Sequence, residues 1–166
     1  PYDSIEGGAK TVSHAGMMAR FILDPNKKEY GKTGSLASLK NFSLDDLEFL
    51  RLIRTMAQYD VILDATISMN SGLEEKTAQD SEESQPWDCG LELAGSIVSA
   101  AFDAGVRIVS GTDYMASRID RFPAVYGEFE ALVDHTSMSP MDVITAATLN
   151  GAAALGMQDK LGTIET

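Results

Sequence analysis

The segment Val106-Arg107-Ile108-Val109-Ser110-Gly111-Thr112-Asp113 decides the fold class that we predict. It is mostly apolar and β-branched at first and then changes to a small polar tip that ends in a carboxylate. Such a run, bounded by turn residues, indicates a buried strand. The residues before it, 91–104, have the pattern of a helix, and Gly105 supplies a C-terminal cap for that helix.

Two more strand-like runs precede this segment. Residues 61–67 form a mostly apolar run with little alternation, which favours a strand covered on both faces, as in a parallel sheet. Residues 11–14 form a short β-branched run that ends at His14. The clearest helix of the chain lies between these two runs, over residues 43–58. We expect Ser43 to cap it, with Asp46 three residues further on.

Helices dominate the sequence after the third strand-like run. Residues 124–133 are predicted to be helical, Ser139 and Pro140 begin a further helix, and a short last helix covers 151–155. Strands that alternate with helices of these lengths imply an α/β fold with βαβ units around a parallel sheet. An open doubly wound sheet and a closed (β/α) barrel both satisfy this pattern, and periodicity does not choose between them. The glycine-rich turn of an open nucleotide-binding sheet does not occur in the sequence.

Composition and charge restrict the class of partner. The chain has 166 residues, 44% of them hydrophobic, and a net charge of −12. These values are typical of a globular protein, and the acidic surface disfavours nucleic acid and anionic membranes as partners. The single cysteine, Cys89, excludes an internal disulfide and a Cys-x-x-Cys metal motif. Without a recognisable signal segment, we expect a cytoplasmic protein, and a homo-oligomer is compatible with the sequence.

Polar side chains stand at the ends of all three strand-like runs. They are His14, then Thr66 and Ser68, then Asp113. In a barrel, catalytic groups lie where strands end, and a His nitrogen with a carboxylate oxygen is a common ligand pair for a divalent ion. From residue types alone, a hydrogen-bonded structural His and an ordinary Gly-Thr-Asp turn are the more common explanations.

A resemblance to a known family favours the metal-site interpretation. Residues 106–113 resemble the eighth barrel strand of the amidohydrolase superfamily, particularly its imidazolonepropionase-like and prolidase-like branch. Residues 128–133, EFEALV, resemble the helix that follows. Residues 138–150, MSPMDVITAATLN, match that branch's MSP-x-x-x-I-x-A-A-T-x-N pattern, and 152–156 and 161–165 continue the match.

The N-terminal region resembles the sixth strand of the same superfamily. Residues 8–16, GAKTVSHAG, are similar to its G-x-x-x-I-x-H-G pattern, with Ala15 in place of the usual glycine. Residues 61–67 then correspond to the seventh strand by their order in the chain. The predicted fold is therefore a partial (β/α)8 TIM barrel, made of strands six to eight with their flanking helices.

The resemblance implies a metal-dependent hydrolase of C–N bonds, acting on a dipeptide or an N-acyl amino acid. Asp113 would bind one divalent metal, with zinc preferred over manganese, iron or nickel, and would also act as the general base. His14 would bind a second metal ion or help to hold a single one. Thr66, Ser68 and Tyr114 would contact the substrate.

Two alternatives remain open. A cyclic amide of the imidazolonepropionase type is the alternative substrate, and Arg118 and Arg121 are candidate contacts for a substrate carboxylate. A non-catalytic structural or binding module is the alternative class. A complete barrel has eight strands, and the family's His-x-His pair is absent from this sequence. We therefore expect residues 1–166 to be the C-terminal portion of the barrel, without its N-terminal half and closing β-domain, and to be inactive alone.

Overall fold

The computed structural model describes residues 2–23, 39, 41–73, 89–113 and 123–165. Helices and short strands alternate over most of this range. In chain order the elements are α1 (Tyr2–Glu6), β1 (Thr11–Ser13), α2 (Ala15–Leu23), α4 (Leu47–Gln58), β2 (Ile62–Asp64), the 3-10 helix η1 (Ser68–Leu73), α5 (Leu91–Asp103), β3 (Ile108–Val109), α6 (Val125–His135), α7 (Pro140–Ala147) and α8 (Leu149–Ala154).

The three described strands form one parallel sheet in the order β1-β2-β3. This confirms the mixed α/β architecture with a parallel sheet, and its small size is consistent with part of a barrel. That these are strands six to eight stays a prediction. The strands are shorter than the sequence predicts. Among the described residues β3 pairs only with β2, and its residues beyond Val109, the partner of Asp64, leave the ladder.

The register of the strands separates the two faces of the sheet. Leu63 pairs with Val12 on one side and with Ile108 on the other, so these three side chains share a face. Leu63 and Ile108 are buried in the main core with apolar residues of α4 and α5, such as Phe49 and Ile97. The opposite face carries the next residues along each strand, which include Ser13, Asp64 and Val109.

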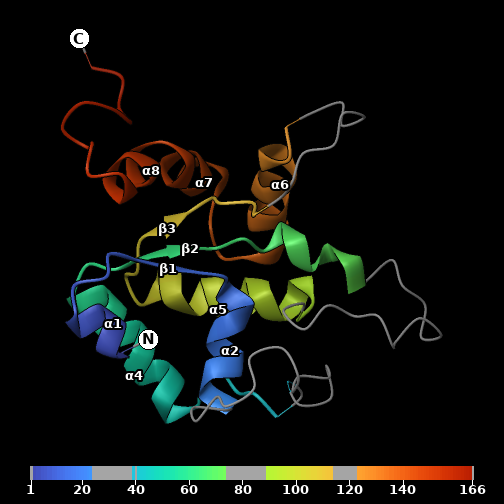
Figure 1. The fold of residues 1–166 in the computed structure, drawn as a ribbon. Coiled ribbons are helices and arrows are strands. Elements are labelled where there is room, and N and C mark those ends of the chain that lie inside the picture. The colour runs from blue at the N-terminus through green and yellow to red at the C-terminus, as the bar shows by residue number, and fades with distance from the viewer. Residues whose placement is uncertain (1, 24–38, 40, 74–88, 114–122, 166) are drawn as a thin grey trace.

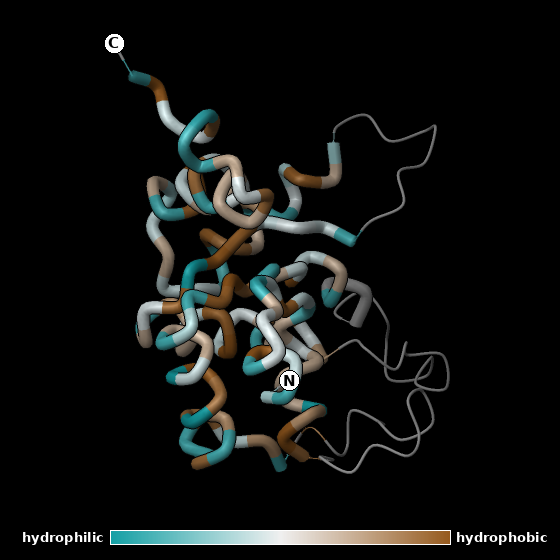
Figure 2. Tube along the Cα trace, turned by 60° about the vertical axis from the view of Figure 1, so that its left-hand side comes forward, coloured by the Kyte–Doolittle hydropathy of each residue, from teal (hydrophilic) through white to brown (hydrophobic). Residues whose placement is uncertain are grey.

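The helices lie on two sides of this sheet. Figure 1 shows α1, α2, α4 and α5 beyond β1 and α6, α7 and α8 beyond β3. Helices α7 and α8 pack against β3, and α5 joins the two groups by packing against both α2 and α6. In both views the segment after α8 extends away from the rest of the molecule (Figures 1 and 2). No helix within the described residues has the length and apolar character needed to cross a membrane.

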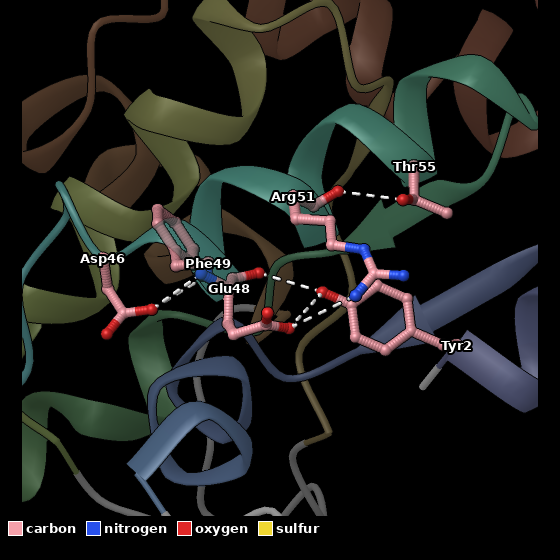
Figure 3. Close-up of polar contacts among 6 residues, drawn as sticks. All are labelled: Tyr2, Asp46, Glu48, Phe49, Arg51 and Thr55. Carbon is pink, nitrogen blue, oxygen red and sulfur yellow. Dashed lines mark hydrogen bonds and ion pairs between the residues drawn. The ribbon is translucent and has the colours of Figure 1, made fainter.

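Helix α4 begins later than predicted. It starts at Leu47, and its cap is Asp46, whose carboxylate accepts hydrogen bonds from the backbone N–H of Glu48 (2.8 Å) and Phe49 (3.3 Å) (Figure 3). The expectation that Ser43 caps this helix is wrong, because the hydroxyl of Ser43 accepts from Asp45 in the turn before the helix. A carboxylate at the N-terminus also interacts favourably with the helix dipole.

Helix α1 is held against α4 by its only aromatic residue. The Tyr2 hydroxyl donates to the backbone oxygen of Glu48 at 2.9 Å, and the Arg51 guanidinium lies 4.9 Å from the centre of the Tyr2 ring (Figure 3). Burial raises the pKa of Tyr2, and the charge of Glu48 raises it further. The first strand is thus preceded by a helix anchored to the core, which the sequence analysis did not predict.

The C-terminal helices follow the sequence more closely. Ser139 caps α7 with Pro140 at its first turn, as predicted, and Asp142 completes a capping box. The side-chain and backbone hydrogen bonds from Ser139 hold the pKa of the Asp142 carboxyl below its ordinary value. Gly105 follows α5 with a positive φ of 87°, as a C-terminal cap requires.

Two helical glycines provide a matched test of the packing between α5 and α6. A Cβ at Gly95 would lie 2.1 Å from the backbone oxygen of His135, whereas a Cβ at Gly127 would meet nothing within 4 Å. We expect Gly95→Ala to lower the free energy of unfolding by about 1–3 kcal/mol through overpacking. We expect Gly127→Ala to raise it by about 0.4–1 kcal/mol. Urea denaturation followed by circular dichroism measures both, and equal effects would contradict the close approach of the two helices.

Candidate metal centre at the strand ends

The carboxyl ends of the three strands meet at one edge of the sheet, because the strands are parallel. Backbone hydrogen bonds continue beyond the strands, from His14 N–H to Asp64 oxygen (2.9 Å) and from Ala65 N–H to Val109 oxygen (3.0 Å). These bonds fix the residues that follow each strand relative to one another. The edge therefore collects His14 after β1, Thr66 after β2 and Asp113 after β3.

The structure brings three of the predicted site residues into contact at this edge. His14 Nε2 lies 3.7 Å from Asp113 Oδ2, and His14 Nδ1 lies 2.9 Å from Thr66 Oγ1. The side chain of His14 is 37% exposed and that of Asp113 is 58% exposed, so both face solvent. Thr66, in contrast, is buried. The imidazole is thus oriented by Thr66 through Nδ1, and its Nε2 lies next to the Asp113 carboxylate.

The backbone at each of these positions is left-handed. The φ angles are 69° at His14, 47° at Thr66 and 47° at Asp113. Only one other non-glycine residue in the described part of the chain, Asp60, has a positive φ. A β-branched residue such as Thr66 rarely adopts this conformation. Because strained residues tend to cluster at functional sites, their position at all three strand ends points to function at this edge.

The hydroxyl of Thr66 lies where it can stabilise one tautomer of His14, the one that is protonated on Nδ1. When Nδ1 carries the proton, it donates to Thr66 Oγ1, and Nε2 keeps its lone pair for a ligand. Metal-binding histidines are commonly oriented by such a bond from their second nitrogen. Thr66 is only 1% exposed, and its hydroxyl contacts the His14 ring. Its predicted contact with substrate stays a prediction.

The pair formed by His14 and Asp113 fits a divalent ion. Zinc binds His nitrogen and carboxylate oxygen at about 2.0–2.2 Å, so one ion can touch two atoms that are 3.7 Å apart. A catalytic zinc usually has three protein ligands. Within the described residues, no group of three or more His, Cys, Asp or Glu side chains is arranged to hold a metal ion. The pair therefore supplies part of a ligand set.

The loop after Thr66 is fixed by a buried carboxylate that the sequence analysis missed. Glu128 of α6 is fully buried and accepts hydrogen bonds from the backbone N–H of Ile67 (3.0 Å) and Ser68 (2.8 Å). Burial raises the pKa of Glu128, the hydrogen bonds from Ser68 and Ile67 oppose this shift, and the charge of Asp64 adds to it. Ser68 thus contacts Glu128 through both its backbone N–H and its side chain, and its predicted contact with substrate stays untested.

A buried amide fixes the far end of the same loop. Asn70 donates to the backbone oxygen of Ile67 at 3.2 Å and accepts from the N–H of Cys89 at 3.0 Å. This joins η1 to the residues just before α5. Together Glu128 and Asn70 satisfy the polar backbone of the segment that carries Thr66, so that its conformation is determined by the surrounding structure.

The other sequence-based candidates are not part of the described strand-end cluster. Tyr114, Arg118 and Arg121 lie outside the described residues. His135 ends α6, and its Nδ1 lies 3.0 Å from Glu92 Oε1 of α5.

Comparison with known protein families gives a match over most of the chain. The model of the amidohydrolase family matches residues 32–166, which is most of the chain and includes Asp113 but not His14. No curated protein matches the chain, and no solved structure does.

The buried carboxylate of Glu128 makes a testable contribution to stability. Because its pKa is raised above 4.5 in the folded state, this contribution is fully present below about pH 4.5 and is lost as the pH rises through the raised pKa. Glu128→Gln removes this titration. We expect the difference in unfolding free energy, wild type minus variant, to fall with rising pH when measured by urea denaturation.

The control for this measurement is Glu130→Gln, which changes an exposed glutamate on the same helix. A wild-type advantage over Glu128→Gln that grows with pH would contradict the raised pKa. It would show that the two backbone N–H bonds outweigh burial.

Proposed function

The chain belongs to the amidohydrolase family, whose members are in general metal-dependent hydrolases, and we propose that it carries one side of an active site that cleaves C–N bonds. The observation that carries the proposal is the position of His14 Nε2, 3.7 Å from Asp113 Oδ2, at the carboxyl edge of a parallel sheet. This is the edge at which barrel enzymes place their catalytic residues.

Each of the residues at this edge has a distinct task in the proposal. A bound divalent ion, preferably zinc, would polarise the substrate carbonyl and lower the pKa of a water molecule. His14 would hold the ion through Nε2, while its Nδ1 contact with Thr66 orients the ring. Asp113 would also ligate the ion, and its carboxylate would accept a proton from the attacking water and pass it to the leaving nitrogen. Its partial exposure leaves room for both steps.

The remaining ligands are proposed to come from another part of the barrel. Within the described residues β1 and β3 pair only with β2, so each has one edge without a strand partner. Unpaired strand edges are sites where further strands add to a sheet. A complementary barrel half would cover these edges and supply at least one more ligand at the carboxyl end.

The proposed substrate is a dipeptide or an N-acyl amino acid, with Ser68 and Tyr114 as contacts. A cyclic amide of the imidazolonepropionase type is the alternative. A second candidate function, a non-catalytic binding or structural module, is favoured by one observation, namely that the described residues provide only two clustered ligands.

Metal analysis combined with hydrolysis assays tests the proposal. The whole protein would be assayed with dipeptides, N-acyl amino acids and cyclic amides, alongside its His14→Ala, Asp113→Asn and His135→Ala variants. We expect His14→Ala to lose bound metal and Asp113→Asn to lower kcat by about 10²–10⁴-fold, as loss of a general base does. His135→Ala, the control at the other histidine, should keep both properties.

The outcomes separate the candidate functions. Wild-type metal content and activity in both site variants would contradict the proposed site. Absence of metal and of hydrolysis in the whole protein would favour the non-catalytic module. Metal-dependent hydrolysis by residues 1–166 alone would contradict the need for a complementary half.

A further inference from the structure

Asp64 occupies the centre of the strand-end edge without belonging to the proposed ligand pair. It is the last residue of β2, where it pairs with Ser13 of β1 and Val109 of β3. Its backbone oxygen accepts the N–H of His14 at 2.9 Å. Its side chain lies on the face of the sheet opposite the main core, on the same side as Ser13 and Val109.

The two oxygens of this carboxylate face the two neighbouring strands. Oδ2 accepts a hydrogen bond from the Ser13 hydroxyl at 3.0 Å, directly before His14 in the chain. Oδ1 is buried and has no hydrogen-bond partner among the described residues. It lies against Gly111, two residues before Asp113, where an added Cβ would be only 1.9 Å away.

Gly111 is required here by space alone. Its φ is not positive, unlike that of Gly105 or Gly156, so an alanine would suit its backbone. The carboxylate of Asp64 fills the volume that a side chain at this position would take. Asp64 therefore contacts, on opposite sides, the segment that leads to His14 and the segment that leads to Asp113.

We propose that Asp64 is a positioning residue that sets the separation of His14 and Asp113. The inference rests on the proposed function in one respect, namely that His14 and Asp113 bind a metal ion. The contacts of Asp64 with Ser13 and Gly111 do not depend on that function. A residue that only filled space here would serve better as an apolar side chain, like its partner Val109, because a buried oxygen without a hydrogen bond is costly. Asp64 does not itself ligate the ion, since Oδ1 is covered by Gly111 and Oδ2 is engaged by Ser13.

The test uses the two histidines of the chain as reporter and internal control. Ring-nitrogen NMR of the metal-free whole protein follows the His14 signals, identified by their loss in His14→Ala, and the His135 signals, identified in the same way, report on changes elsewhere. We expect Asp64→Ala to shift the His14 signals and leave those of His135 in place. Titration with Zn²⁺, followed on the same signals, should show a loss of affinity of about 10–100-fold, as loss of a residue that orients a ligand does.

Conservative and matched variants separate positioning from other roles. Asp64→Asn keeps the shape and an acceptor for Ser13, so it should retain most of the Zn²⁺ affinity. Asp103→Ala removes a carboxylate that also accepts from a serine, Ser137 at 3.0 Å, but at the end of α5. It should leave His14 and its affinity unchanged. Equal losses in Asp64→Asn and Asp64→Ala would overturn the proposal, because they would indicate that charge matters and not position.

A double-mutant cycle tests the contact with Gly111. Gly111→Ala alone should weaken Zn²⁺ binding, because the new Cβ displaces the Asp64 carboxylate. In the Asp64→Ala background the same change should cost much less, since the clashing atoms are gone. Independent, multiplicative losses would overturn the proposal. If wild type binds no Zn²⁺ at His14, the proposed function fails, and the His14 signals of the metal-free variants still decide the role of Asp64.

Discussion

Parallel pairing of β1, β2 and β3 is the constraint on which the rest of the structure depends. It places the ends of three segments that are distant in sequence at one edge, and the hydrogen bond from His14 to Asp64 extends the alignment past the last strand residue. Without this register, the side chains of His14 and Asp113 would not lie next to each other. The helices serve the same end, because the core formed by α4 and α5 against one face leaves the strand ends open.

Maintaining this edge requires polar groups in unfavourable positions. Glu128 is fully buried so that the backbone after Thr66 has acceptors for its N–H groups, and Asp64 keeps one oxygen buried without a partner among the described residues. Left-handed backbone at His14, Thr66 and Asp113 adds strain at the same place. Local costs of this kind are typical of functional sites, where the surrounding structure maintains a geometry that isolated residues would not adopt.

Much of this arrangement could be predicted from the sequence, for reasons that differ between residues. Polar residues directly after apolar runs marked the strand ends, and the resemblance to the amidohydrolase superfamily then assigned His14 and Asp113 as metal ligands. The cap of α7 followed from Ser139 and Pro140. Asp46 was missed as the cap of α4 because Ser43 also fits the capping pattern, and only the geometry of the turn distinguishes them.

The residues that support the site were harder to find. Glu128 shares a helical stripe with the buried Ala131 and Leu132, and a carboxylate in such a stripe is the one signal that could have revealed it. Its partners lie about sixty positions earlier, at Ile67 and Ser68, and no local pattern links them. In the sequence Asp64 is a single polar residue within an apolar strand. Its role was not predictable, because its contact with Gly111 forms only when the strands pair.

The most direct test of the central claim, that the strand ends form half of a metal centre, is an anomalous-difference map from crystals of the whole protein containing zinc. The account predicts one ion in contact with both Nε2 of His14 and a carboxylate oxygen of Asp113. It predicts further ligands from outside the described residues. Zinc that touches neither residue, in crystals of hydrolytically active protein, would contradict the account.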